Sequence, residues 1–228
     1  PDRPRCSGMQ KPSPKDLRRA VEEALSGVSP EPEKKGETGK TGPENRNRPG
    51  IKPEHMTHLR DNHLVYKDHP RIAFRGAIDS LESDIILVQI LAEKKGLCKL
   101  TQDLQEIIKA IRWLLRCEVS GDPVGELTLL GLDTDQMRAH SHHPSQYYGM
   151  RHFLPDYQKG EMVAHLNRLR TRAREVELTS YRAFKKEDGE VWREDIIRML
   201  NRLSSLFWIM MFQYLTGKYG EEEERSQR

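Results

Sequence analysis

The sequence is poor in cysteine and has no long hydrophobic run. Its three cysteines, Cys6, Cys98 and Cys117, are widely spaced among 228 residues and form no CxxC pair. This pattern is typical of unpaired thiols in a reducing compartment, so a cytoplasmic location is expected. The longest apolar run, residues 206–212, is far shorter than the roughly 20 residues that a membrane-spanning helix needs. Neither a membrane span nor a secretory signal is predicted.

The chain also lacks a basic surplus outside its first 50 residues. Residues 1–50 carry 11 Lys and Arg against 8 Asp and Glu, which accounts for the whole formal net charge of +3. The rest of the chain is formally neutral, whereas nucleic-acid binding needs a basic face on the folded part. We therefore expect no nucleic-acid partner and no membrane partner.

Residues 29–50 contain no aliphatic, aromatic, Met or Cys side chain. Such a segment cannot bury enough surface to offset its ordering entropy, so it is predicted to be a flexible linker. Ahead of it, Ser13 and Pro14 open a short predicted helix that ends at Gly27. We expect a mostly disordered tail over residues 1–50, a folded domain over 51–220 and an acidic terminus over 221–228.

Four long segments repeat apolar residues at helical spacing, and each presents one apolar stripe. They cover residues 71–95, 101–119, 160–184 and 194–216. Asp133 and Thr134 can cap a shorter helix over 135–139, and an irregular segment follows to Asp156. No segment alternates with the period of a strand. The predicted fold class is all-α, a bundle of four long helices plus a short one.

The third long segment places Arg170, Arg174 and Glu177 on one face, at positions i, i+4 and i+7. One interpretation is a polyphosphate clamp, because the guanidinium fork matches phosphate oxygens and Glu177 can fix an arginine or accept from a ribose. The other interpretation is a solvated helix face, because further arginines lie on the same segment. The spacing alone leaves both open.

Several motifs in chain order resemble those of corrinoid adenosyltransferases. Residues 170–177 are similar to the signature RTxxRRxE, and residues 200–204, LNRLS, are similar to LNRLSD. Residues 66–71 and 76–79 resemble the segment KDDPRVxAYGxxDELN. The ethanolamine-utilization branch is closer still, through residues 56–59, 68–71, 125–131, 141–142 and 201–205. The resemblance covers about residues 52–216.

This resemblance implies an enzyme that transfers the 5'-deoxyadenosyl group of ATP to the cobalt of cob(I)alamin, giving adenosylcobalamin and triphosphate. It implies ATP with Mg²⁺, cobalamin reduced from Co(II) to Co(I), and a flavin or flavoprotein reductant. It further implies a homo-oligomer, with a trimer expected and a dimer as the alternative, and association with a bacterial microcompartment. The alternative function is a non-catalytic helical bundle that binds or delivers cobalamin.

The resemblance also assigns roles by position. It implies that Arg170 and Arg174 contact ATP phosphates, and that Glu177 and Asn201 hold the nucleotide or its Mg²⁺. Thr57 and Lys67 would belong to the N-terminal nucleotide-binding region. Asp79 would pair with Arg170 of a neighbouring subunit, and Phe153 would cover the lower face of the corrin. For Phe153, plain core packing is the alternative. Trp208, in the run 206–212, is predicted to be a core residue.

The chain departs from the family pattern at three places. Glu175 stands where many relatives have a second arginine, and Ser205 stands where they have aspartate. The CCxxC metal cluster of some ethanolamine-type members is missing, because residues 42–56 contain no cysteine, so no resident transition metal is predicted. His140, His142 and His143, with His152, remain metal candidates against loop packing or hydrogen bonding to corrin side chains.

Overall fold

The computed structural model describes residues 52–60 and 62–220. The predicted tail helix and linker of residues 1–50 and the acidic terminus lie outside the described residues. The chain divides into two units, Pro1–Lys52 and Pro53–Arg228, and all the elements named below belong to the second.

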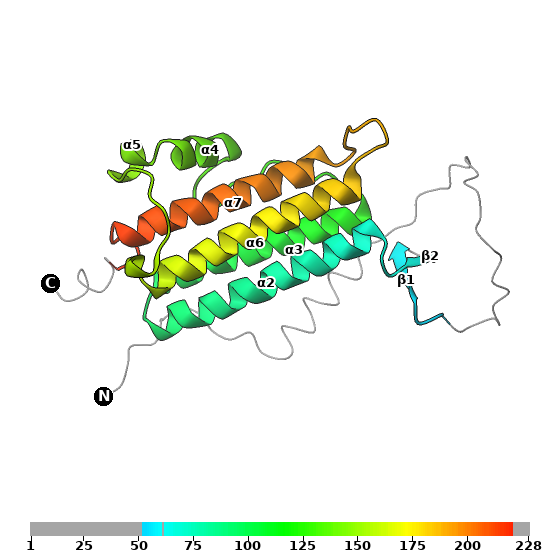
Figure 1. Ribbon diagram of the computed structural model, residues 1–228, viewed down its shortest axis with the longest axis horizontal. Coiled ribbons are helices and arrows are strands. Elements are labelled where there is room, and N and C mark those ends of the chain that lie inside the picture. Colours follow the sequence, from blue (N-terminus) through cyan, green and yellow to red (C-terminus); the bar gives the residue numbers. More distant parts are fainter. Residues whose placement is uncertain (1–51, 61, 221–228) are drawn as a thin grey trace. The chain divides into compact units, whose positions relative to one another are not determined.

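Four long helices pack side by side in a bundle (Figure 1). They are α2 (Pro70–Lys94), α3 (Cys98–Ser120), α6 (Glu161–Phe184) and α7 (Glu194–Leu215). Helix α6 packs against both α2 and α7, and α2 also packs against α3. Their apolar stripes meet in one core, in which Phe74, Ile107, Leu166 and Phe207 are among the fully covered side chains. The predicted all-α bundle is confirmed.

Local chemistry explains where two of these helices begin and end. Helix α2 begins with Pro70 in its first turn, where a missing N–H costs nothing, and the His69 ring accepts from the backbone N–H of Arg71 at 3.2 Å. Helix α3 ends at Gly121, whose φ of +86° is a left-handed conformation that favours glycine.

Two short helices lie along α7 (Figure 1). Helix α4 (Thr134–His142) begins with a capping box between Asp133 and Gln136 and is longer than the predicted span of 135–139. Helix α5 (Pro144–Tyr148) falls in the segment predicted to be irregular, and the 3₁₀ turn η1 (Tyr157–Lys159) follows directly after that segment. The same segment is otherwise extended and crosses the end of α7 that carries Trp208 and Phe212.

The prediction that no segment forms strands is wrong for one hairpin. Strands β1 (Met56–Arg60) and β2 (His63–Tyr66) pair antiparallel ahead of α2. Only Leu59 and Val65 among their residues are buried. With one covered side chain in each strand, the hairpin has no alternating apolar pattern that a sequence could display.

The structure also bears on the two predictions from composition. Cys117 is a free, buried thiol, as expected, and Cys6 lies outside the described residues. Across the described part of the chain, no helix combines the length and the apolar character that crossing a membrane requires.

Candidate functional site

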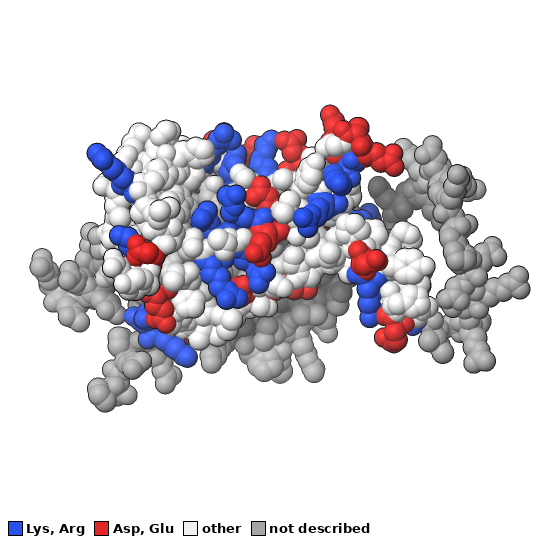
Figure 2. Space-filling view, viewed as in Figure 1, with Lys and Arg blue, Asp and Glu red and all other residues white. Residues whose placement is uncertain are grey.

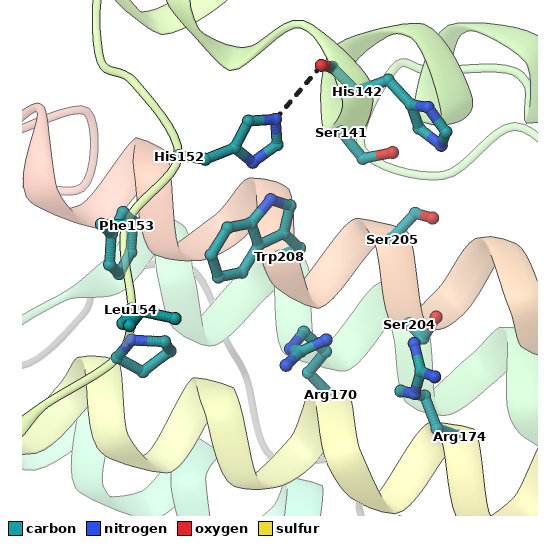
Figure 3. A pocket seen from close by; sticks show the side chains of 11 residues that line it. Ser141, His142, His152, Phe153, Leu154, Arg170, Arg174, Ser204, Ser205 and Trp208 are labelled. Carbon is teal, nitrogen blue, oxygen red and sulfur yellow. Dashed lines mark hydrogen bonds between the residues drawn. The ribbon is translucent and has the colours of Figure 1, made fainter.

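A cavity of about 440 Å³ opens between α6, α7 and the segment that follows α4 (Figure 3). Arg170 and Arg174 rise into it from α6, toward Trp208, Ser204 and Ser205 on α7. The remaining lining residues come from α4 and from the segment after α5: Ser141, His142, His152, Phe153, Leu154 and Pro155. We call this space the aromatic-arginine cavity.

The basic side of this cavity is formed by Arg170 and Arg174. The Nε atom of Arg170 donates to Asn167 Oδ1 at 3.2 Å, and its Cζ atom lies 5.4 Å from the centroid of the Trp208 ring. Burial and the positive charge of Arg174 lower the pKa of Arg170 from its usual value. No carboxylate is among the described residues that line the cavity, so the two guanidinium groups give it a positive charge.

The opposite side is aromatic. The ring of Phe153 stacks on Trp208 with a centroid distance of 5.0 Å and meets Phe212 edge to face at 5.2 Å. The His152 ring is nearly parallel to Trp208, with 6.1 Å between centroids. Trp208 is only partly buried, because its ring borders the cavity. The prediction of Trp208 as a core residue therefore describes only part of its surroundings.

A second cavity, of about 960 Å³, continues from Arg170 and Arg174 to Glu177 and Ile197. The structure brings the predicted residue Asn201, which lines a third cavity, next to Glu177: Asn201 Nδ2 donates to Glu177 Oε1 at 3.0 Å. The Asn201 side-chain oxygen in turn accepts from Arg202 Nη1 at 2.7 Å. This third cavity, of about 460 Å³, is lined by Glu177, Asn201 and Arg202. One groove along α6 and α7, made of the three cavities, is therefore lined by five of the predicted site residues: Phe153, Arg170, Arg174, Glu177 and Asn201.

Three other predicted residues lie elsewhere in the described chain. Thr57 is in β1, where it pairs with Val65, and Lys67 follows β2 with its backbone N–H donating to His55 O at 3.1 Å. Asp79 is exposed on α2. None of the three lines the cavities of the groove, and within the described residues of one chain no ion pair joins Asp79 to Arg170.

The histidines are engaged with aromatic and backbone groups. The Nδ1 atom of His140 is hydrogen-bonded to the Tyr148 hydroxyl at 2.8 Å, and its ring stacks on Tyr147 at 3.7 Å. The Nε2 atom of His152 lies 3.2 Å from the His142 carbonyl oxygen (Figure 3). No group of His, Cys, Asp and Glu able to hold a metal ion occurs among residues 52–60 and 62–220. Only His142 and His152 reach the cavity.

Charge on the viewed face of the bundle is mixed. Figure 2 shows blue and red side chains interspersed over α6 and α7, with blue groups concentrated near the middle. Outside the cavities, Arg168 and Arg172 of α6 both contact Asp84 on α2, at 3.2 and 3.1 Å. Arg170 and Arg174 differ from these two neighbours because they line the aromatic-arginine cavity, which has no carboxylate among its described lining residues.

Comparison with known proteins shows the family of this chain. The profile of the family described as cobalamin adenosyltransferase matches residues 51–214. The chain belongs to this family. Corrinoid adenosyltransferase EutT of Escherichia coli K12 is 34% identical over 166 residues, and that of Salmonella typhimurium LT2 is 35% identical over 161 residues. No solved structure matches the chain.

The matches to the two relatives are partial in length. They cover 72% and 70% of this chain but only 60% and 58% of the EutT proteins. The matched part of this cobalamin adenosyltransferase family member includes α6 and α7, and with them the whole groove.

The sequence did not identify several residues that line the groove. Trp208 was hidden in an apolar run, and Leu154 carries no pattern of its own. Ser141 and Ser204 belong to motifs that resemble the family, but no role was assigned to them. One signal was available for Trp208: it lies seven residues after Asn201, two helical turns along α7, and therefore on the same face as a predicted site residue.

Proposed function

We propose that this chain transfers the 5'-deoxyadenosyl group of ATP to the cobalt of cob(I)alamin, giving adenosylcobalamin and triphosphate. One observation carries the proposal: a single cavity joins an aromatic wall, Phe153 and Trp208, to a pair of arginines without a facing carboxylate. The family match and the activity of the two relatives, which are named corrinoid adenosyltransferases, support it.

The arginine end suits the polyphosphate of ATP. Arg170 and Arg174 present permanently charged donors from one helix face, and a guanidinium fork matches the oxygens of phosphate. In the transfer, Co(I) attacks C5' of ATP, a Co–C bond forms, and the C5'–O bond breaks with its electron pair leaving on triphosphate. Negative charge thus grows on the leaving group, where fixed cations stabilise the transition state. No side chain needs to act as a general acid or base.

The aromatic end suits the corrin. Phe153 and Trp208 form an apolar wall next to Leu154, a large hydrophobic side chain that is 87% exposed in the free protein. A planar macrocycle can cover such a surface. An apolar wall against the lower face also keeps a water or base ligand off Co(II), which makes reduction to Co(I) easier; we assign this role to Phe153. Ser141, His142 and His152 supply polar groups for the corrin side chains.

The residues of the second cavity fit Mg²⁺ carried by ATP. Magnesium prefers oxygen ligands and is held by one or two carboxylates together with substrate phosphates and water. Glu177 offers one oxygen that accepts from Asn201 and a second that has no hydrogen-bond partner in the described part of the chain. When bound, Mg²⁺ would neutralise phosphate charge, and Glu177 would hold it beside Arg174.

The proposal extends to parts of the assembly that lie outside one chain. We place Asp79 against Arg170 of a neighbouring subunit in a homo-oligomer, a trimer or else a dimer, and take the exposure of Asp79 as compatible with that contact. Thr57 and Lys67 keep a proposed role in nucleotide binding through their resemblance alone. Residues 51–220 would carry the transfer, with residues 1–50 dispensable for it. A flavin or flavoprotein reductant, and a location in the cytoplasm or at a microcompartment, belong to the same proposal.

The decisive experiment is an anaerobic incubation of the protein with Mg-ATP and chemically reduced cobalamin. The absorption spectrum should change from that of cob(I)alamin to that of adenosylcobalamin, with one triphosphate formed for each corrinoid. A protein that binds cobalamin but leaves both spectrum and ATP unchanged would support the alternative, a binding or delivery protein.

A further inference from the structure

Arg202 is the next residue of α7 after Asn201, and its guanidinium group lies partly buried in the third cavity. Its Nη1 atom donates to Asn201 Oδ1 at 2.7 Å. Its Nε atom is buried and has no hydrogen-bond partner among the described residues. A buried donor without a partner is costly, so the contact with Asn201 is the main interaction that keeps this side chain in place.

The charged surroundings of Arg202 do not explain its position. Arg138 and Arg198 line the same cavity, and burial together with Arg138 lowers the pKa of Arg202 from its usual value, while Asp135 acts in the opposite direction. Three arginines and three carboxylates line this cavity, which makes it nearly neutral and a poor anion site by itself. The geometry instead directs Arg202 toward Asn201.

The two hydrogen bonds of Asn201 fix the orientation of its amide. The oxygen faces Arg202 and the NH₂ group faces Glu177 Oε1. If the amide were reversed, its NH₂ group would face a guanidinium that can only donate, and its oxygen would face a carboxylate that can only accept. Arg202 therefore selects the amide orientation that donates to Glu177.

We propose that Arg202 is a positioning residue which, through the Asn201 amide, holds the Glu177 carboxylate beside the arginines of α6 for binding Mg-ATP. The inference rests on the proposed function for the identity of the ligand. Its structural basis is the chain of contacts from Arg202 to Asn201 to Glu177, which ends in the cavity that also contains Arg170 and Arg174.

The test compares three variants of the full chain by titration with Mg-ATP in calorimetry and by transfer kinetics. Arg202→Met keeps the length of the side chain but removes its donors, and should raise the Kd and the KM for Mg-ATP on the order of tenfold. Arg202→Lys retains a donor for Asn201 and should stay within about threefold of wild type. The KM for cobalamin should not change, because Arg202 does not line the aromatic-arginine cavity.

Arg198→Met is the matched control. Arg198 lies one turn earlier on α7 and lines the same cavity, but it forms a 3.7 Å ion pair with Glu194 instead of a contact with Asn201. Removing it deletes the same charge from the same cavity without touching Asn201, so Mg-ATP affinity should change less than about twofold. Equal losses for Arg198→Met and Arg202→Met would show that the charge of the cavity matters and would overturn the positioning role.

A double-mutant cycle separates action through Glu177 from any other effect. If Arg202 acts through Glu177, adding Arg202→Met to Glu177→Gln should weaken Mg-ATP binding by less than about twofold beyond Glu177→Gln alone. A further tenfold loss in that background, or no loss in the wild-type background, would overturn the inference. So would a lower melting temperature of the Arg202→Met variant with unchanged Mg-ATP affinity, which indicates a structural role only.

The wild-type protein distinguishes failure of this inference from failure of the proposed function. If it binds Mg-ATP but transfers no adenosyl group, the proposed function is contradicted and the double-mutant cycle can still be measured. If it binds no Mg-ATP, both the proposed function and the positioning role of Arg202 are overturned.

Discussion

The guanidinium of Arg170 lies over the face of Trp208, with its Cζ atom 5.4 Å from the ring centroid. This contact joins the two halves of the proposed site, because Arg170 belongs to the phosphate end and Trp208 carries the ring on which Phe153 stacks. A cation over an aromatic face is stabilised by roughly 0.5–2 kcal/mol, depending on burial. The pair therefore holds an arginine in place before a substrate arrives.

Trp208→Leu should weaken cobalamin binding by about tenfold, because the Trp208 ring and its stacking contact with Phe153 would be lost from the apolar wall. Affinity can be measured by titrating the protein and following the corrinoid spectrum. Trp113→Leu is the control, because Trp113 is on α3 and its Nε1 atom donates to Val124 O, away from the cavity. Equal losses in the two variants would contradict the assignment of the corrin wall.

Arg174→Ala should lower the rate of adenosyl transfer by at least about a hundredfold, the effect typical of removing a group that stabilises charge in the transition state. The melting temperature should stay close to that of the wild type, because Arg174 is exposed and does not fill the core. Arg182→Ala, an exposed arginine two turns later on α6, should leave the rate nearly unchanged. Activity within a few-fold of wild type for Arg174→Ala would refute the phosphate clamp.

If Asp79 meets Arg170 across a subunit boundary, each site is built from two chains. Asp79→Ala and Arg174→Ala are each expected to be inactive alone. Mixing the two variants under conditions of subunit exchange should restore part of the transfer activity, because some boundaries then combine an intact Asp79 with an intact pair of arginines. Exchange verified by mass spectrometry but without recovery of activity would indicate sites built within single chains.

Glu118→Gln should destabilise the fold by about 3 kcal/mol or more, because it removes a buried carboxylate and leaves two partly buried arginines, Arg71 and Arg75, without their counter-charge. The Glu118 carboxylate is fully buried and accepts from Arg71 Nε at 2.5 Å and from Arg75 Nε at 2.7 Å. The control is Glu82→Gln, whose partner Arg112 is exposed, and it should cost less than about 1 kcal/mol. Urea unfolding followed by circular dichroism gives both values, and similar values would argue against a structural role for the buried cluster.

Stability should fall as the pH drops below about 6.5. Burial, and then the charge of Lys218, lower the pKa of His140 in the folded protein. As the pH falls, His140 of the unfolded chain therefore takes up a proton before His140 of the folded protein does. The contribution of neutral His140 to the free energy of unfolding is full above pH 6.5, and it is lost as the pH falls toward the pKa of His140 in the folded protein. Melting temperatures at pH 7.5 and 5.5 measure the slope. Lys218→Met should flatten it; an unchanged slope would show that Lys218 does not act on His140.

The sequence by itself determined the secondary structure of the bundle. Apolar residues at i, i+3 and i+4 fix a helix locally, so the four long helices were predicted to within a few residues, and Gly121 and Asp133 marked a stop and a start. The β1–β2 hairpin was not predicted because Leu59 and Val65 are its only buried residues, which is too few to produce the alternating apolar pattern of a strand. Arg170, Arg174 and Glu177 share a face by spacing alone, but paired arginines such as Arg168 and Arg172 show the same spacing.

Only the tertiary structure decided which arginines face a cavity and what stands opposite them. Arg172 forms an ion pair with Asp84 on α2, whereas Arg170 lies over the Trp208 ring on α7. The two side chains differ because they extend from α6 toward different neighbouring helices. The contacts from Arg202 through Asn201 to Glu177 likewise cross from α7 to α6. Helical periodicity is a property of one segment, whereas the partner of a side chain depends on how segments distant in sequence pack together.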